Sequence, residues 1–481
     1  MGDLAMLNLA MSGNPRYQPK DLIDYFGYDR LYQPVSEVEI ANLRTLAEIH
    51  VIPRKEIMML TPAMEELLLG ITTTEVDGIE RNVTKHDIRA WVRIAQERMN
   101  CRLSRWLHAM LTSYDPLDTA RSIQFKRSYD HVLKPSIHEA IGLMADLVEQ
   151  NAGVLQIGRT HGRAALPITV GFWLATILDR MIVNAAFMDQ YSQNLVGKIS
   201  GAVGAYNAQV GLGITQRCGK KTYEERLLTK VGLKPGDISR QIVAPEPMNY
   251  YLFSVLMLSG AFGQFGRDGR QLMRSEIEEI LESKDQGDVG SSTMTGKVNP
   301  IIFENIEGAW WKNAAEFLKP LFTVISEHQR DLVGSSLLRD FPTMVINLDT
   351  QLGNILRKDK KTQTPWLARL VVNTANCTAN FNRFKHLILG EPIYIALQMA
   401  GYPGDAHKLI NEEIAPINRT TKRPLIELIE EKAQSDTELG TALAAIPADV
   451  VRLLHTPEEY TGSAKGQALK IVDKAREFIS N

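Results

Sequence analysis

Residues 250–282, YYLFSVLMLSGAFGQFGRDGRQLMRSEIEEILE, form the stretch of sequence that decides the fold. Apolar side chains recur in it at the spacing of one face of an α-helix. They are Phe262, Phe265, Leu272, Met273, Ile277 and Ile280. Four glycines in the same stretch would weaken an isolated helix. They are Gly260, Gly263, Gly266 and Gly269. We therefore expect a helix buried among others in a long bundle, where small residues permit close backbone approach. The alternative is a helix that breaks at the glycines.

The same helical periodicity appears on both sides of this stretch. Upstream it involves Trp173, Leu174, Ile177, Leu178, Met181 and Ile182, and downstream we expect a third long helix over residues 303–330. Strand signals are scarce, so the sequence predicts an all-α chain. We expect three regions: an N-terminal helical domain over residues 1–111, a central long-helix bundle over 112–382 and a small C-terminal helical domain over 383–481.

Composition excludes several classes of function. The chain has 481 residues, of which 44% are hydrophobic and 23% charged, as in a soluble globular protein that can bury a large core. A formal charge of -2 provides no electrostatic footprint for nucleic acid. Three widely separated cysteines suggest neither a disulfide framework nor a zinc site. The N-terminus lacks a signal-peptide pattern and no uninterrupted apolar run reaches membrane-spanning length, so we expect a cytoplasmic protein without a membrane partner.

Residues 290–300, GSSTMTGKVNP, concentrate chemical groups in a short segment. The segment combines two adjacent serine hydroxyls, the Lys297 ammonium and the Asn299 carboxamide, and glycines flank these groups. Backbone N-H groups and a cation beside mobile glycines suit a lid that closes over an anion. An ordinary polar surface loop is the alternative.

This segment resembles the signature Gly-Ser-Ser-x-Met-Pro-x-Lys-x-Asn-Pro of the fumarase/aspartase superfamily, whose members release fumarate or a related product. Thr295 stands where the signature has proline, which should loosen the lid. IGRTHGRAALPITVG, residues 157–171, resembles a second block of the superfamily and places Thr160 and His161 in a glycine-flanked loop before a long helix. In that block Arg163 replaces a glutamine.

Three further segments resemble adenylosuccinate lyases within this superfamily. They are TKHDI at residues 84–88, TSYDPLDTA at 112–120 and RDLVGSSLLR at 330–339. The last one carries two arginines and two serines, which suit a phosphate dianion because arginine donates bidentate hydrogen bonds and stays charged. The segments that distinguish fumarases, aspartases and argininosuccinate lyases are absent from the chain.

The resemblance implies that His161 is the general acid and Ser291 the general base of an elimination. It implies that Lys297 and Asn299 stabilise the developing negative charge of the substrate. His86 is expected to bind the nucleotide phosphate, or alternatively to support His161. The substrate-binding residues that the resemblance implies are Arg16, Tyr17, Lys85, His86, Asp87, Thr112, Ser113, Thr160, Gln241, Ser292, Lys297, Val298, Asn299, Glu304, Asn305, Arg330, Ser335, Ser336 and Arg339. Trp310 and Trp311 are expected to be packing residues.

The resemblance implies a homotetramer whose bundle core combines four subunits and whose active sites are composite. The implied reaction releases fumarate from adenylosuccinate to give AMP, and from SAICAR to give AICAR, in purine biosynthesis. It requires no metal and no organic cofactor. Two alternatives remain open at this point. One is a superfamily lyase or cycloisomerase that acts on a non-nucleotide succinyl or muconate substrate, and the other is a non-catalytic tetrameric derivative.

Overall fold

The computed structural model describes residues 18–283, 294 and 297–480. The chain divides into two compact units, and each unit combines segments that are distant in sequence. The first unit consists of Met1–His138, Val183–Gly263 and Asn305–Asn354, and the second of Glu139–Ile182, Gln264–Glu304 and Ile355–Asn481. The division into three domains expected from the sequence stays a prediction.

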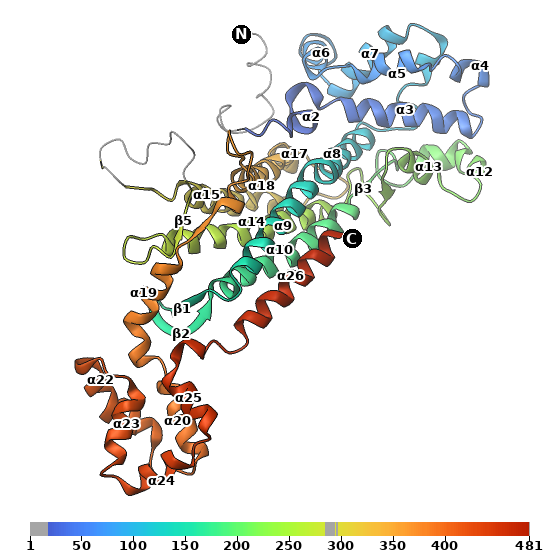
Figure 1. The fold of residues 1–481 in the computed structure, drawn as a ribbon. Helices are drawn as coiled ribbons and strands as arrows, with labels where there is room; N and C mark the ends of the chain where they lie inside the picture. The colour runs from blue at the N-terminus through green and yellow to red at the C-terminus, as the bar shows by residue number, and fades with distance from the viewer. Residues whose placement is uncertain (1–17, 284–293, 295–296, 481) are drawn as a thin grey trace. The chain divides into compact units, whose positions relative to one another are not determined.

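Helices account for most of the described chain, so the fold is all-α as predicted (Figure 1). The long helices are α9 (Lys134–Gln150), α10 (Val170–Gln193), α14 (Glu246–Leu272), α15 (Ile301–Glu316), α18 (Pro342–Ile355) and α26 (Ala464–Ser480). The N-terminal helices include α3 (Gln33–Glu48), α5 (Pro62–Leu69), α6 (Thr73–Ile79), α7 (Asp87–Met99) and α8 (Tyr114–Ser128). Shorter helices that matter below are α13 (Tyr223–Lys230), α16 (Leu318–Phe322) and α17 (Val333–Leu338).

Short strands form two-stranded pairs in the part of the chain that the structure describes. β1 (Leu155–Thr160) and β2 (Arg163–Thr169) are antiparallel, as are β5 (Ile280–Leu281) and β6 (Val371–Val372). β3 (Val196–Gly197) and β4 (Lys234–Pro235) are parallel.

Helix α14 continues without a break through all four glycines, so the broken-helix alternative is wrong. A Cβ atom at Gly263 would lie 2.8 Å from the Cβ of Trp310, and one at Gly269 would lie 2.2 Å from the ring of Phe303. Trp310 therefore packs against the glycine face of α14, as expected of a packing residue. Trp311 differs from that expectation, because it is 57% exposed.

The bounds of two helices differ from the expectations. α14 begins at Glu246 and ends at Leu272, and the helix expected over residues 303–330 ends at Glu316. The short helix α16 follows, and Pro320 lies inside it. Proline lacks the N-H that a longer helix would use. Periodicity alone overestimated the length of this helix, because apolar residues continue past its end.

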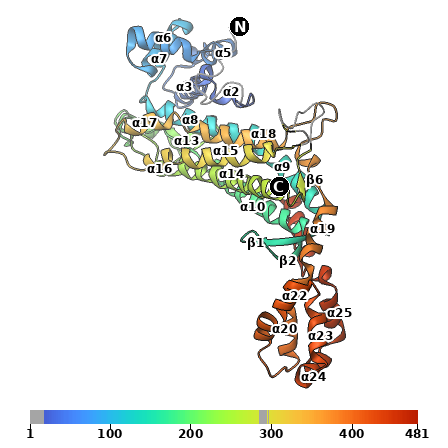
Figure 2. The same cartoon turned by 90° about the vertical axis from the view of Figure 1, so that its left-hand side faces the viewer.

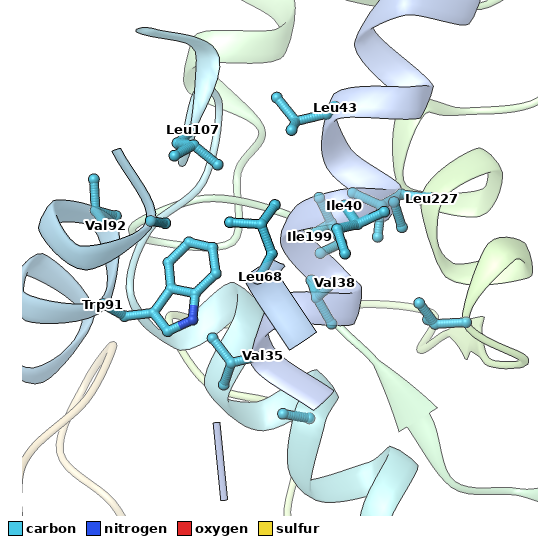
Figure 3. Packing of buried hydrophobic residues seen from close by; sticks show 14 of the residues in the cluster. Val35, Val38, Ile40, Leu43, Leu68, Trp91, Val92, Leu107, Ile199 and Leu227 are labelled. Carbon is cyan, nitrogen blue, oxygen red and sulfur yellow. The ribbon is translucent and has the colours of Figure 1, made fainter. Parts of the chain in front are cut away.

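The core of the first unit packs α3, α5, α7 and α13 around apolar side chains (Figure 3). Val35, Leu68 and Trp91 are buried there. The indole N-H of Trp91 donates to the Ser36 hydroxyl at 3.0 Å, and that hydroxyl donates to the carbonyl of Leu68 at 2.8 Å. These polar atoms keep hydrogen-bond partners inside the apolar core, which avoids the cost of burying unpaired groups.

The second unit has its own core, which the C-terminal helices build (Figure 2). These helices are α19 (Thr374–Phe384), α20 (Gly390–Met399), α22 (Ala415–Thr421), α23 (Leu425–Ala433), α24 (Thr437–Ala445) and α25 (Ala448–His455). Ile157 of β1 joins this core, together with Phe381 of α19. The β1–β2 hairpin is therefore packed against the second unit's helices.

Helix α10 is long and apolar enough, by length and composition, to cross a membrane. Asp179 and Arg180 interrupt its apolar residues, so α10 does not contradict the expectation that no uninterrupted apolar run reaches this length. In addition, 56% of its apolar window is buried within the chain, which is typical of a core helix in a soluble protein.

We predict that Gly269→Ala destabilises the chain, because the added methyl group would overlap the buried ring of Phe303. Overpacking of this kind costs about 1–3 kcal/mol. Gly466→Ala in α26 is the matched control, because no atom lies within 4 Å of a Cβ at that position. An exposed helical glycine replaced by alanine should stabilise by about 0.5–1 kcal/mol. Thermal unfolding of both variants measures the difference, and equal melting temperatures would contradict the close approach of the Phe303 ring to α14.

Candidate functional site

His86 and Ser113 come together in the first unit, although 27 positions separate them in the sequence. His86 occupies the N-cap position of α7, and its Nε2 lies 3.3 Å from the Ser113 hydroxyl. Its Nδ1 lies 3.1 Å from a carboxylate oxygen of Asp87. Lys85 precedes His86 in the left-handed conformation, with φ 53°. The predicted segments 84–88 and 112–120 therefore meet at one end of α7.

A buried ion pair anchors the beginning of α8 beside these residues. Lys198 and Asp115 are both fully buried, and Lys198 Nζ lies 2.5 Å from Asp115 Oδ1. The backbone N-H groups of Thr112, Ser200 and Gly201 also donate to the Asp115 carboxylate. Burial raises the pKa of the Asp115 carboxyl above its usual value, and the Lys198 ammonium and these N-H groups oppose that shift. Through this carboxylate the structure sets the position of Thr112, one of the predicted binding residues.

Arg330 and Ser335 converge on Tyr114, the first residue of α8. The guanidinium carbon of Arg330 lies 3.3 Å from the centre of the Tyr114 ring. The tyrosine hydroxyl lies 3.1 Å from the Ser335 hydroxyl, and Arg330 Nη1 donates to Gln241 Oε1 at 3.0 Å. Three predicted residues, Gln241, Arg330 and Ser335, are thereby brought together. Ser336 instead donates its hydroxyl to the carbonyl of Val333 at 3.2 Å.

Arg339 follows α17 and is exposed. Its neighbouring acids have other partners: Asp340 pairs with Lys319 at 2.8 Å, and Asp331 accepts the N-H groups of Glu327 and Val333. Neither carboxylate therefore forms an ion pair with Arg339 in the described chain.

The pKa of the Glu80 carboxyl responds to its burial and to charges of both signs. Burial raises the pKa of the Glu80 carboxyl, and the charges of Asp87 and Asp77 act in the same direction. The charges of His86 and Arg339 oppose that rise. His86 and Arg339 therefore both act against the effect of burial on the pKa of the Glu80 carboxyl.

A pocket in the first unit lies beside Tyr114. Its polar lining residues include Tyr114, Arg330 and Ser335, together with Asp118, Arg121 and Asp331. Its apolar wall includes Val243, Pro245, Pro247, Met248, Leu338 and Phe341. A pocket with largely apolar walls and a few convergent polar groups is the usual form of a small-molecule site. Among the described residues, no group of three or more His, Cys, Asp or Glu side chains is arranged to hold a metal ion.

In the second unit, Thr160 and His161 lie on a β-hairpin. The expectation that they lie in a glycine-flanked loop without strands is therefore wrong. Thr160 is the last residue of β1 and pairs with Arg163 of β2, which leaves His161 and Gly162 as the turn. Both turn residues have positive φ, 54° and 72°, as a tight two-residue hairpin requires. The turn exposes the His161 side chain. Scarce strand signals concealed this hairpin in the sequence.

Buried Glu279 holds the hairpin in place. Its carboxylate accepts two hydrogen bonds from the Arg159 guanidinium, at 2.6 and 3.0 Å. It also accepts from Gln156 at 2.8 Å and from Asn380 at 2.9 Å. The carboxylate therefore connects β1, which ends at the residue before His161, with helix α19. Sequence reasoning missed Arg159 and Glu279, since 120 positions separate them.

The remaining predicted residues lie at the start of α15 or outside the described chain. Lys297, Val298 and Asn299 precede α15, and Glu304 and Asn305 lie exposed near its N-terminus. Glu282 accepts the N-H groups of Ile302 and Phe303 at 3.2 and 2.8 Å, which caps this helix end. Burial raises the pKa of the Glu282 carboxyl, and these two N-H groups oppose the shift. Predicted residues outside the described chain are Arg16, Tyr17, Ser291 and Ser292.

We predict that Glu279→Gln destabilises the chain strongly, because it leaves the Arg159 guanidinium without its buried counter-charge. Removing one partner of a buried ion pair costs about 3–5 kcal/mol. Glu149→Gln is the matched control: Glu149 also pairs with an arginine, Arg476 at 2.5 Å, but both side chains are about half exposed. Solvent screens that pair, so the control should have little effect. Thermal unfolding compares the two variants, and equal losses would show that Glu279 does not anchor the hairpin.

Comparison with known proteins places this chain among lyases. The profile of the family described as lyase matches residues 30–312, more than half of the chain. Adenylosuccinate lyase of Archaeoglobus fulgidus is 28% identical over 96% of this chain and 98% of its own length. N-acetyl-S-(2-succino)cysteine lyase of Dickeya dadantii is 27% identical over 97% of both chains. The crystal structure of 3-carboxy-cis,cis-muconate lactonizing enzyme from Pseudomonas putida shares the fold, with a TM-score of 0.77 at 19% identity over 96% of this chain and 98% of that one. The chain belongs to the lyase family of the fumarase/aspartase superfamily and is an enzyme of the lyase class.

Proposed function

We propose that this lyase is an adenylosuccinate lyase. It eliminates fumarate from adenylosuccinate to give AMP, and from SAICAR to give AICAR, in purine nucleotide biosynthesis. The proposal includes a cytoplasmic homotetramer with composite active sites. The family assignment supports an elimination of this type, and the groups of the candidate site support the choice of substrate.

The observation that carries this proposal is a cluster in the first unit of groups that suit phosphate binding. Arg330 and Ser335 both contact Tyr114. Arg339 directly follows α17, the short helix that contains Ser335, and forms no ion pair in the described chain. A nucleotide monophosphate is a dianion, and arginine donates charge-assisted hydrogen bonds to phosphate oxygens. A succinyl or muconate substrate without a phosphate would not need this concentration of donors.

The elimination itself needs a base, an acid and stabilising donors. The base removes a weakly acidic carbon-bound proton beside a carboxylate, while the acid protonates the departing nitrogen. By resemblance, Ser291 is the base and His161 the acid. The exposed hairpin turn gives His161 access to a ligand. Lys297 and Asn299 would stabilise the negative charge that develops on the substrate carboxylate.

A non-nucleotide succinyl substrate is the second candidate. It is favoured by the full-length similarity to the N-acetyl-S-(2-succino)cysteine lyase of Dickeya dadantii, whose substrate name contains no nucleotide. Such an enzyme would use the same acid, base and carboxylate-stabilising groups. It would not require Arg330, Ser335 and Arg339 to bind an anion.

The experiment that separates the two candidates is a spectrophotometric assay of the purified full-length chain. Adenylosuccinate and N-acetyl-S-(2-succino)cysteine are offered in parallel, and fumarate release is measured for each. The proposal expects turnover of adenylosuccinate and competitive inhibition by AMP. Turnover of the cysteine derivative alone, without inhibition by AMP, would establish the second candidate.

We predict that Arg339→Leu weakens the binding of adenylosuccinate and of AMP to a similar extent. The weak binding of fumarate should stay unchanged. A charge-assisted hydrogen bond contributes about 1.5–3 kcal/mol, so KM should rise about tenfold or more. Arg452→Leu is the control, because this exposed arginine is paired with Glu459 near the C-terminus, away from the Tyr114 and Arg330 cluster. Calorimetry with AMP measures the effect. Equal AMP affinity in Arg339→Leu and the unaltered chain would contradict the nucleotide assignment.

A further inference from the structure

Tyr114 lies at a position that the backbone holds firmly. It is the first residue of α8, and the next residue is the fully buried Asp115. Lys198 and three backbone N-H groups bind the Asp115 carboxylate. A shift of Tyr114 along or away from α8 would pull this carboxylate from its buried partners. The aromatic ring is therefore a fixed surface in the first unit.

The ring of Tyr114 orients the guanidinium of Arg330. The guanidinium carbon lies 3.3 Å from the ring centre, and Gln241 accepts from Nη1 at 3.0 Å. The Nε of Arg330 is buried and has no hydrogen-bond partner within the described residues. A free arginine side chain has many rotamers, and ordering it on binding reduces affinity. Stacking on Tyr114 fixes the plane of Arg330 before any ligand arrives.

The hydroxyl of Tyr114 fixes a second group of the cluster. It lies 3.1 Å from the hydroxyl of Ser335, in the short helix that leads to Arg339. One side chain thus contacts two of the residues that the proposed function assigns to phosphate binding. Asp118 lies one turn further along α8. Its carboxylate accepts the N-H of Val243 at 2.9 Å and a hydrogen bond from Arg121 at 2.8 Å, so its hydrogen-bond partners are groups other than Arg330.

We infer that Tyr114 is a positioning residue for nucleotide phosphate, which acts by holding Arg330 and Ser335 in the geometry that binds the anion. This inference rests on the proposed function. Because Tyr114 acts on binding and not on proton transfer, its loss should raise KM and the dissociation constant of AMP by the same factor. The turnover rate at saturating substrate should stay within about twofold, since uniform binding leaves kcat unchanged.

Two substitutions separate the ring from the hydroxyl. Tyr114→Phe keeps the ring under Arg330 and removes the bond to Ser335, so AMP should bind about fivefold more weakly. Tyr114→Leu removes both contacts, and AMP should bind about twentyfold more weakly or worse. Tyr25→Phe is the matched control, because in the described part of the chain that hydroxyl is hydrogen-bonded to the His131 ring, at 2.9 Å, and the variant should leave AMP binding unchanged. A loss of folded protein would instead lower kcat and leave KM unchanged.

A double-mutant cycle tests whether Tyr114 acts through Arg330. In an Arg330→Gln background, Tyr114→Leu and Tyr114→Phe should bind AMP equally, because the stacked partner is gone. Calorimetry with AMP on the full-length chain measures each variant. If Tyr114→Leu binds AMP as the unaltered chain does, or if Leu and Phe still differ in the Arg330→Gln background, the inference is wrong and the proposed function stands. If the unaltered chain binds no AMP, the proposed function fails and this inference fails with it.

Discussion

The buried ion pair between Asp115 and Lys198 is the interaction on which the candidate site depends. An unpaired carboxylate in a dry interior would lose several kcal/mol of hydration, so it persists only with a counter-charge and further donors. Lys198 supplies the charge at 2.5 Å, and the N-H groups of Thr112, Ser200 and Gly201 supply the donors. Removing Lys198 or one of these N-H donors would leave part of the buried Asp115 charge without a partner. The pair therefore joins the first turn of α8 to the segment around residue 200.

From this pair a chain of contacts runs through the first unit and returns to its start. Ser200 is hydrogen-bonded to Ser239 at 2.6 Å, and Arg240 donates to the carbonyl of His328 at 3.1 Å. The next residue, Gln241, accepts from Arg330, which stacks on Tyr114 beside Asp115. A closed series of this kind restrains each member from two sides. It explains how the side chain of Arg330, which lies on a segment between helices, is held in one orientation.

The sequence predicted the helices better than the contacts between them. Helical periodicity and the four glycines of α14 correctly indicated a helix packed closely on another. Glycines leave room for large rings on the neighbouring helix, and their spacing can be read from the sequence of α14 alone. The β1–β2 hairpin was missed, since positive φ at a histidine has no reliable signal in one sequence. Motif resemblance selected His86 and Ser113, which lie together in the structure, and Arg330 and Ser335, which both contact Tyr114. It did not find Lys198 or Glu279, because buried partners at large sequence separation follow from tertiary packing alone.

Hydrogen exchange at the amides that bind Asp115 tests the central claim most directly. If the ion pair anchors α8 and the segment around residue 200, then the N-H groups of Thr112, Ser200 and Gly201 open only when the first unit unfolds. We predict exchange at these amides as slow as in the buried helices α3 and α7, despite their places outside regular helix. Exchange as fast as at the exposed residues 219–221 would contradict the account.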